Sequence, residues 1–212
     1  KKINHLTCVE INIRRSISPW HDLLALVQLF IFFKRGKIEI AHSTTPKAGL
    51  LTALAAHLAT VPVRLHTFTG QPWVDMPGIK GKLARFSDWT IGKLNTRCYA
   101  DSKSQREFLI QQRIVERDRI FVIGTGSLAG VDIHRFDPSR FSISDRASLK
   151  AACGISAEDH VILFLGRITV DKGVRELLSA FKRIKSLRSN AHLLFVGQFD
   201  MDSGAAGIVS KD

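Results

Sequence analysis

The chain has few cysteines, and they are too scattered to serve a common structural purpose. Cys8, Cys98 and Cys153 are odd in number, far apart and set among apolar neighbours. This spacing argues against a disulfide framework and a cysteine-based zinc site. We expect three buried thiols in a reducing compartment, which predicts a cytoplasmic protein.

Long apolar runs and acidic residues are also scarce. The longest apolar stretch, residues 23–33, is interrupted by Gln28 and is too short to span a bilayer. Only 19 acidic residues oppose 31 basic ones, so the 212-residue chain carries a net charge of +12. Such a charge favours an anionic partner: a nucleic acid, an anionic membrane surface or a phosphorylated ligand.

Short apolar segments alternate with longer segments of helical spacing. We expect strands at residues 5–13, 38–42, 61–67, 97–100 and 120–123, and helices at 18–34, 47–59, 80–94 and 102–112. The alternation predicts an α/β fold with a parallel sheet and helices on both faces. The helix at 18–34 is apolar nearly all round, as expected for a helix packed on a sheet. Ser18-Pro19 and the pair Ser102 and Gln105 are helix start signals.

A second α/β segment follows a change of pattern. Residues 124–130 form a glycine-rich loop that no helix follows, so this loop is not a dinucleotide fingerprint. We expect residues 131–143 to connect two domains. A helix at 145–153, a strand at 161–165, a helix from Val174 and a strand at 192–196 then begin the second domain. Two strands are too few for an independent sheet, which predicts a truncated domain over residues 144–212.

Residues 161–174, VILFLGRITVDKGV, combine a buried-strand pattern with a loop that carries two cations. Gly166 ends the apolar run, Arg167 follows it, and Lys172 stands just before the helix that begins at Val174. Ligands of parallel sheets bind beyond the carboxyl ends of strands, where a helix N-terminus adds free N–H groups. The pattern predicts a cradle for a diphosphate. The alternative is a solvated loop whose cations face water.

Four stretches, taken together and in order, identify a family. They are Ile40–Trp73, Ala100–Leu109, Gly124–Pro138 and Val161–Phe181, which begin IAHSTTPKAG, ADSKSQ, GTGSLAGVD and VILFLGR. The chain resembles the family 4 (group 1) glycosyltransferases of the GT-B fold, in the branch that builds bacterial capsule, O-antigen and exopolysaccharide. The resemblance implies two Rossmann-like domains, with an acceptor-side domain over residues 1–130 and a nucleotide-sugar domain over 144–212.

The resemblance also implies an activity and its partners. A retaining enzyme of this kind moves a sugar from a nucleotide-sugar donor, most commonly a UDP-sugar, to a lipid-linked or other saccharide acceptor. In the family, the positions of Arg167 and Lys172 hold the donor diphosphate, in the loop that Gly166 opens. Two fixed cations and a helix dipole would stabilise the departing diphosphate, which is the work of a metal ion elsewhere. The resemblance therefore implies a metal-independent enzyme without a cofactor.

Residues 66–71, HTFTGQ, end a strand where the resemblance places the cleft. Many relatives carry a second histidine at the position of Thr69, so His66 or Gln71 is the candidate catalytic residue here. Thr69, Gly70 and Gly126 are candidate contacts of the donor. The alternative for His66 is a core histidine with satisfied hydrogen bonds. A structural role is also preferred for His42, which precedes a proline-started helix.

The chain departs from the family at its C-terminal side. The family's E-x7-E pair handles the donor sugar, but Glu176 has Ile184 at the matching distance. The pair would follow Asp212, and the family's opening glycine-rich loop would precede Lys1. We therefore expect a fragment that lacks both ends and does not catalyse transfer by itself.

One face of the helix at 80–94 combines basic and aromatic side chains. Lys82, Arg85, Trp89 and Lys93 share this face, and Trp73 lies in the loop before it. Such a face suits an anionic membrane surface, where a lipid-linked acceptor would be found, and predicts a peripheral location on the inner face of the cell membrane. The alternative is a solvated basic face with Trp89 folded onto the body of the protein.

Two other functions account for part of the sequence. A basic nucleic-acid-binding module would explain the charge, but no nucleic-acid motif is present and a single tyrosine offers little stacking. We expect no nucleic-acid partner. A sugar-nucleotide epimerase of related fold is the other alternative, and the stretches HTFTGQ and ADSKSQ argue against it. Hydrolase motifs such as GxSxG and HExxH are absent.

Overall fold

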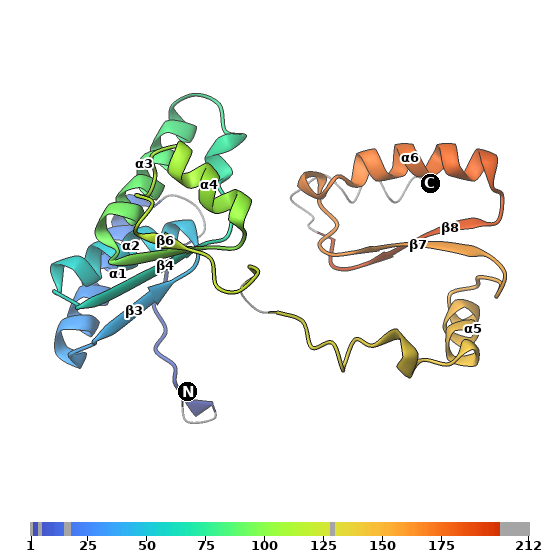
Figure 1. Cartoon of the computed structure of the whole chain (residues 1–212), viewed down its shortest axis with the longest axis horizontal. Coiled ribbons are helices and arrows are strands. Elements are labelled where there is room, and N and C mark those ends of the chain that lie inside the picture. Colours follow the sequence, from blue (N-terminus) through green and yellow to red (C-terminus); the bar gives the residue numbers. More distant parts are fainter. Residues whose placement is uncertain (1, 4–5, 15–17, 128–129, 200–212) are drawn as a thin grey trace. The chain divides into compact units, whose positions relative to one another are not determined.

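The structure is a computed structural model that describes residues 2–3, 6–14, 18–127 and 130–199 (Figure 1). Internal contacts divide the chain into two compact units, Lys1–Gly130 and Val131–Asp212. The boundary follows Gly130, which is also the last residue of the predicted first domain. The roles predicted for the two domains stay predictions.

The first unit is built on a parallel sheet whose strands follow chain order. These are β3 (Ile40–Ser43), β4 (Val63–Phe68), β5 (Arg97–Ala100) and β6 (Ile120–Phe121), hydrogen-bonded in the order β3-β4-β5-β6. Helices α2 (Pro46–Leu58), α3 (Gly78–Leu94) and α4 (Lys103–Gln111) connect successive strands. The predicted α/β fold with a parallel sheet is confirmed. Because every strand pair is parallel, the carboxyl ends of all four strands meet at one edge.

The predicted helix start signals are present in modified form. α1 (Pro19–Gly36) begins at Pro19, where the missing N–H of proline leaves no bond unmade. The hydroxyl of Ser18 makes no hydrogen bond to the backbone of α1. At α4, Gln105 N donates to Ser102 Oγ at 3.1 Å, and Gln105 Oε1 accepts from Asp101 N at 2.7 Å. The second bond falls one residue earlier than in a standard capping box.

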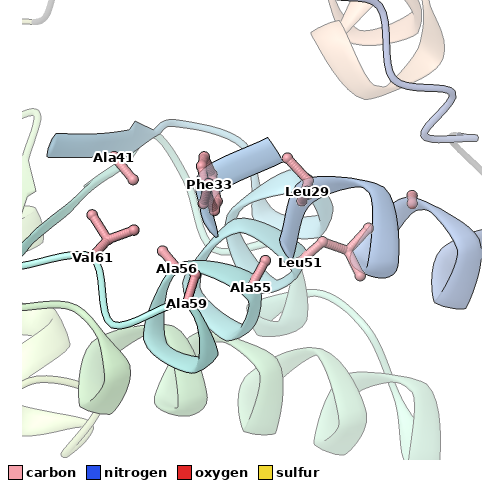
Figure 2. Close-up of a cluster of buried hydrophobic side chains, with 9 residues drawn as sticks. Leu29, Phe33, Ala41, Leu51, Ala55, Ala56, Ala59 and Val61 are labelled. Atoms are coloured by element: carbon pink, nitrogen blue, oxygen red, sulfur yellow. The ribbon is translucent and has the colours of Figure 1, made fainter. Parts of the chain in front are cut away.

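Small side chains of α2 allow α1 to pack closely against it. Ala55 and Ala56 are fully buried and face Leu29 and Phe33 of α1, with Ala41 of β3 in the same cluster (Figure 2). Burying one leucine or phenylalanine side chain contributes about 1.5–3 kcal/mol. A second buried cluster joins the sheet to α3 and α4 and contains Phe68, Ile91, Cys98, Ala100, Leu109, Ile114, Val115 and Ile120.

The predicted strand at 5–13 is wrong for most of its length. Only β2 (Leu6–Thr7) is a strand, and it pairs antiparallel with β1 (Lys2–Ile3). His5 lies outside the described residues. Ile11 and Ile13 pack against the α1–α2 cluster and have no strand partner among the described residues, so their alternation comes from this packing.

We expected α1 to be packed on a sheet because it is apolar nearly all round, and this expectation is wrong for one face of the helix. Ala25, Leu29 and Phe33 are buried, but the opposite side of the helix is an exposed apolar stripe of Trp20, Leu23, Leu24, Val27 and Ile31. The helix is therefore apolar all round while only one side is covered by the described residues.

The second unit, in its described residues 131–199, contains two α-helices and a two-stranded parallel sheet. α5 (Ile143–Ala152) begins with a reciprocal cap between Ser142 and Asp145. β7 (His160–Leu165) pairs with β8 (Ala191–Val196) along the full length of both strands, and α6 (Val174–Leu187) connects them. The core is small: Ile168 and Val174 are buried, with Phe164 and Phe195 packed against them.

The prediction of three buried thiols holds for one cysteine. Cys98 is buried in β5, and burial raises the pKa of its thiol to about 12. Cys8 and Cys153 are exposed, so the prediction is wrong for both. Cys8 falls in the segment that forms no strand, and Cys153 follows the last residue of α5.

Candidate functional site

The predicted diphosphate loop lies between the carboxyl end of β7 and the start of α6. Gly166 follows β7, and the exposed side chains of Arg167 and Lys172 come from the loop after it. A short turn, η3 (Val170–Lys172), precedes Gly173, which is the N-cap residue of α6. The strand–loop–helix arrangement expected for residues 161–174 is therefore present.

The end of the neighbouring strand supports this loop. Gly166 N donates to Val196 O at 3.0 Å, and Ile168 N donates to Gln198 O at 2.9 Å. Gly197 permits the approach, because a Cβ atom there would overlap the carbonyl oxygen of Gly166. Sequence reasoning missed Gly197. The available signal was the Val-Gly that ends β8 in the same way as Leu-Gly ends β7.

Both cations of the loop act on one carboxylate. The neighbouring Thr169 side chain, and then the positive charges of Lys172 and Arg167, lower the pKa of the exposed Asp171. Asp171, Arg167 and Lys172 all belong to the loop between β7 and α6, where charges attract across short distances. A more highly charged anion, such as a diphosphate, can compete with Asp171 for the same two cations.

The N-terminus of α6 adds to the positive charge of the loop. Gly173 has no side chain, and no side chain caps the first N–H groups of the helix. These groups and the helix dipole favour a bound anion. Glu176 already places one carboxylate in the first turn. An anion there would meet two cations and free N–H groups, with Asp171 and Glu176 as competitors.

In the first unit, His66 of β4 lies in the core. Its side chain is 1% exposed, its Nδ1 lies 2.8 Å from Ser43 Oγ, and its ring packs edge-on against Phe68. Gly49 of α2 covers the ring so closely that a Cβ atom would stand 2.9 Å from Nδ1. Burial, and secondarily the charge of His42, lower the pKa of His66 to about 4. These contacts are those of the core alternative, and a catalytic role for His66 stays a prediction.

His42, for which a structural role was preferred, is the exposed histidine at the same sheet edge. Its Nε2 lies 2.8 Å from Thr67 Oγ1. Thr67 also lines a hollow of about 60 Å³ together with Asp101 and Gly126. Successive residues of a strand face opposite sides of a sheet, so Thr67 faces away from the layer that holds His66. This alternation was the signal that could have separated the two histidines.

Thr69, Gly70 and Gln71 follow β4 at the carboxyl edge. Thr69 is exposed, and a Cβ atom on Gly70 would meet no other atom within 4 Å, so the space beside this backbone is open. Gln71 Oε1 accepts from Gln105 Nε2 at 3.4 Å, while Gln71 Nε2 has no partner among the described residues. This Nε2 atom is covered, but Gln71 as a residue is half-buried and His66 is buried, so Gln71 lies nearer the surface of the two catalytic candidates.

Gly126 is required by the fold of this edge. A Cβ atom on Gly126 would overlap the carbonyl oxygen of Asp101, and the N–H of Gly126 already donates to Ile123 O at 3.0 Å. Its amide is used within the turn and is not directed at a ligand. The predicted donor contact of Gly126 therefore depends on the hollow that it lines.

The basic and aromatic face predicted for α3 is divided between inward and outward contacts. Trp73 stacks on Phe108 and donates Nε1–H to Asp88 at 2.7 Å, and Arg85 lies over the Trp73 ring. Trp73 is half-buried and held against the unit by these contacts. The other four members of the predicted face are exposed: Lys82, Arg85, Trp89 and Lys93. Their contact with a membrane stays a prediction.

The loop and the sheet edges define a class of protein. A cation-bearing loop between a parallel strand and a helix N-terminus is typical of α/β proteins that bind nucleotides. Within residues 2–3, 6–14, 18–127 and 130–199, no group of three or more His, Cys, Asp or Glu side chains is placed to hold a metal ion. No helix within those ranges is long and apolar enough to cross a membrane.

Comparison with known proteins shows which proteins the chain is similar to. Residues 145–206 match the family model described as "Glycosyl transferases group 1". The capsular polysaccharide biosynthesis glycosyltransferase CapM of Staphylococcus aureus is 28% identical over 197 residues, which cover 91% of this chain and 50% of CapM. The UDP-Gal:alpha-D-GlcNAc-diphosphoundecaprenol alpha-1,3-galactosyltransferase of Escherichia coli is 28% identical over 172 residues, which cover 80% of this chain and 42% of that enzyme. The resemblance to group 1 glycosyltransferases is thereby confirmed, and the chain spans about half the length of these relatives.

Solved structures agree in fold. HepE of Anabaena, crystallised with UDP, has a TM-score of 0.55 and 16% sequence identity, and the match covers 84% of this chain and 52% of HepE. The same protein crystallised with UDP-glucose has a TM-score of 0.54. At this identity the likeness extends to the α/β fold alone.

Proposed function

We propose that this protein acts as a retaining glycosyltransferase in surface polysaccharide synthesis, with a nucleoside diphosphate sugar as donor and a lipid-linked or other saccharide as acceptor. The observation that carries the proposal is that Arg167 and Lys172 are exposed in the loop between the carboxyl end of β7 and the uncapped start of α6. The family match over residues 145–206 includes this loop. A uridine donor is favoured because one relative is named for UDP-galactose and HepE was crystallised with UDP-glucose.

The proposed chemistry follows from charge. As the bond between the sugar and the donor's β-phosphate breaks, negative charge grows on the leaving diphosphate. Arg167 offers a planar fork for two oxygens, Lys172 adds a point charge, and the α6 N-terminus adds N–H groups of the same polarity. Groups that are fixed before the reaction stabilise this charge without reorganising, and we propose that they do so without a metal ion.

The first unit is proposed to contribute the acceptor side. Gln71 is the candidate for a hydrogen bond to a sugar hydroxyl, because its Nε2 has no partner among the described residues. His66 is too buried to reach a substrate in this conformation, so we propose that it holds Ser43 and the end of β4 in position.

Replacing Arg167 with alanine is expected to weaken UDP binding by about 10–100-fold. The variant loses a charge-assisted hydrogen bond, which contributes about 1.5–3 kcal/mol, and tenfold in affinity corresponds to about 1.4 kcal/mol. Isothermal titration of UDP into the 212-residue chain measures the effect. Titration with and without EDTA tests the proposed independence from metal.

Arg183→Ala is the matched control, because Arg183 is an exposed arginine of the same helix, α6, away from its N-terminus. This control should bind UDP as the unchanged chain does. Equal UDP affinities for the unchanged chain and Arg167→Ala would contradict the assignment of the loop. Loss of binding on adding EDTA would contradict the metal-independent mechanism alone.

A further inference from the structure

The outer face of α3 carries an apolar stripe that the sequence reasoning did not single out. Ile79, Leu83 and Phe86 lie at positions i, i+4 and i+7 of the helix, so they share one face. Their residues are 74%, 59% and 61% exposed. Met76, in the turn before the helix, is also exposed. An exposed stripe of this kind on a single helix is typical of an interaction surface.

The opposite face of the same helix already has its partners. Gly81, Asp88, Ile91 and Gly92 are the buried residues of α3, and the helix contacts α2 on that side. The outer stripe is therefore not a core face left over from the packing of α3. It is a second apolar face of the helix, with nothing against it among the described residues of the first unit.

Basic residues border the stripe on both sides. Lys82 stands about 60° from its centre around the helix on one side, and Lys80 about 100° on the other. Both are exposed, whereas Asp88, the one acidic residue of α3, is buried. Exposed apolar side chains with cations at their borders are the pattern of a helix that lies in an anionic lipid surface.

The C-terminal end of the stripe offers groups suited to lipid headgroups. Trp89 stacks on Phe86 with ring centroids 5.5 Å apart and remains 40% exposed. It borders a surface hollow of about 320 Å³ that Lys93, Arg113 and Arg117 also line. Lys93 pairs with Glu116 and Arg117 with Glu107, while Arg113 has no ion pair among the described residues. Tryptophan at the membrane interface and a spare arginine in a hollow fit a phosphate headgroup.

We propose that α3 docks this protein onto an anionic lipid bilayer, with Ile79, Leu83 and Phe86 among the acyl chains and Lys80, Lys82 and Arg113 at the headgroups. The charge argues for lipid over a protein partner, because the exposed charges of α3 are all basic and the whole chain carries +12. The exposed stripe of α1 has no such border along its length: its cations, Lys34 and Arg35, stand in the last turn. It therefore serves here as the rival surface in the test.

Flotation with vesicles tests the proposal on the 212-residue chain without any nucleotide, so its outcome is independent of UDP binding. The unchanged chain should float with vesicles of phosphatidylcholine and phosphatidylglycerol, less so in high salt, and not with phosphatidylcholine alone. The double variant Leu83→Ser/Phe86→Ser should bind the anionic vesicles about a hundredfold more weakly. Lys80→Gln/Lys82→Gln should weaken binding by about tenfold or more.

Two controls separate α3 from other exposed apolar residues. Leu187→Ser removes an exposed leucine of α6 and should leave flotation unchanged. Trp20 on α1 and Trp89 on α3 serve as reporters, because brominated lipids quench only tryptophans that reach the acyl chains. Quenching should persist in Trp20→Phe and largely vanish in Trp89→Phe.

The result that overturns the proposal is equally specific. If the anionic vesicles do not bind the unchanged chain, or bind Leu83→Ser/Phe86→Ser equally well, α3 is not the docking surface. If quenching vanishes in Trp20→Phe instead, the stripe of α1 binds the lipid and the assignment to α3 is wrong. A cooperative denaturant transition of the serine variant, followed by the fluorescence of the tryptophans in the first unit, would show that its loss of lipid binding is not a loss of folding.

Discussion

Replacing Asp88 with asparagine is expected to raise the free energy of unfolding at pH 7 by about 2–3 kcal/mol. Burial raises the pKa of Asp88 to about 6, although the indole N–H of Trp73 donates to its carboxylate. The shift from 3.8 is about two units, and each unit corresponds to 1.36 kcal/mol. An asparagine oxygen can still accept from Trp73, so the variant removes the buried charge and keeps the hydrogen bond.

The sign of the pH dependence follows from proton binding. Between about pH 4 and pH 6 the folded protein holds the proton on Asp88 more tightly than the unfolded chain does, so this group lowers the free energy of unfolding as pH rises. His66 acts in the opposite direction over nearly the same range. Its pKa is lowered from 6.5 to about 4, so its contribution to the free energy of unfolding falls as pH falls from about 6.5 to 4.

The two groups therefore mask each other in the unchanged protein, and single variants should reveal them. Asp88→Asn should lose stability as the pH is lowered from 6.5 to 4, and His66→Gln should gain stability over the same range. The double variant should be nearly independent of pH there. All three tryptophans, Trp20, Trp73 and Trp89, belong to the first unit, so denaturant unfolding followed by tryptophan fluorescence reports on that unit alone. If the free energy of unfolding of Asp88→Asn matched that of the unchanged chain at every pH, the pKa of Asp88 would not be raised in the folded protein.

The order of strands and helices could be predicted from the sequence because each element carries a local pattern. The strand at Arg97–Ala100 was expected at the residues where it is found, since an apolar run there lies between two helical segments. The segment over residues 8–13 shows the limit of such patterns. Ile11 and Ile13 alternate as in a strand, but a strand also needs a hydrogen-bonded neighbour, and the sequence of a segment does not show whether one is near.

For the candidate site, the sequence predicted where residues lie in the fold better than it predicted which way their side chains point. His66 lies at the carboxyl edge of β4 as expected, but the packing of Gly49 and Phe68 turns its ring into the core. Trp73 was predicted to join the membrane-facing basic and aromatic side chains of α3, yet the carboxylate of Asp88, fifteen residues later, accepts its N–H. Both outcomes depend on partners distant in sequence. Gly197 was missed for the same reason, since its importance comes from Gly166 on another strand.

Gly197→Ala is expected to have the largest effect of any change in the second unit, with a loss of more than about 4 kcal/mol of stability. The added Cβ atom would overlap the backbone of Gly166, and backbone atoms cannot rotate away as a flexible side chain can. The ends of β7 and β8 must then separate. Separation breaks the hydrogen bonds from Gly166 N to Val196 O and from Ile168 N to Gln198 O, and Arg167 stands between the two donors.

Amide hydrogen exchange and UDP titration measure the two consequences separately. The N–H groups of Gly166 and Ile168 should exchange slowly in the unchanged chain and fast in Gly197→Ala, and UDP affinity should fall at least as far as in Arg167→Ala. Gly154→Ala is the matched control, because Gly154 has a φ of +69° but no atom within 4 Å of the added Cβ. Gly154→Ala should lower the stability by only about 1–2 kcal/mol, the cost of a left-handed backbone for alanine. Amide exchange at Gly166 and Ile168 and the affinity for UDP should stay unchanged. Slow exchange at Gly166 in Gly197→Ala would contradict the steric argument even if UDP affinity fell, whereas fast exchange with undiminished UDP affinity would place the diphosphate site away from this loop.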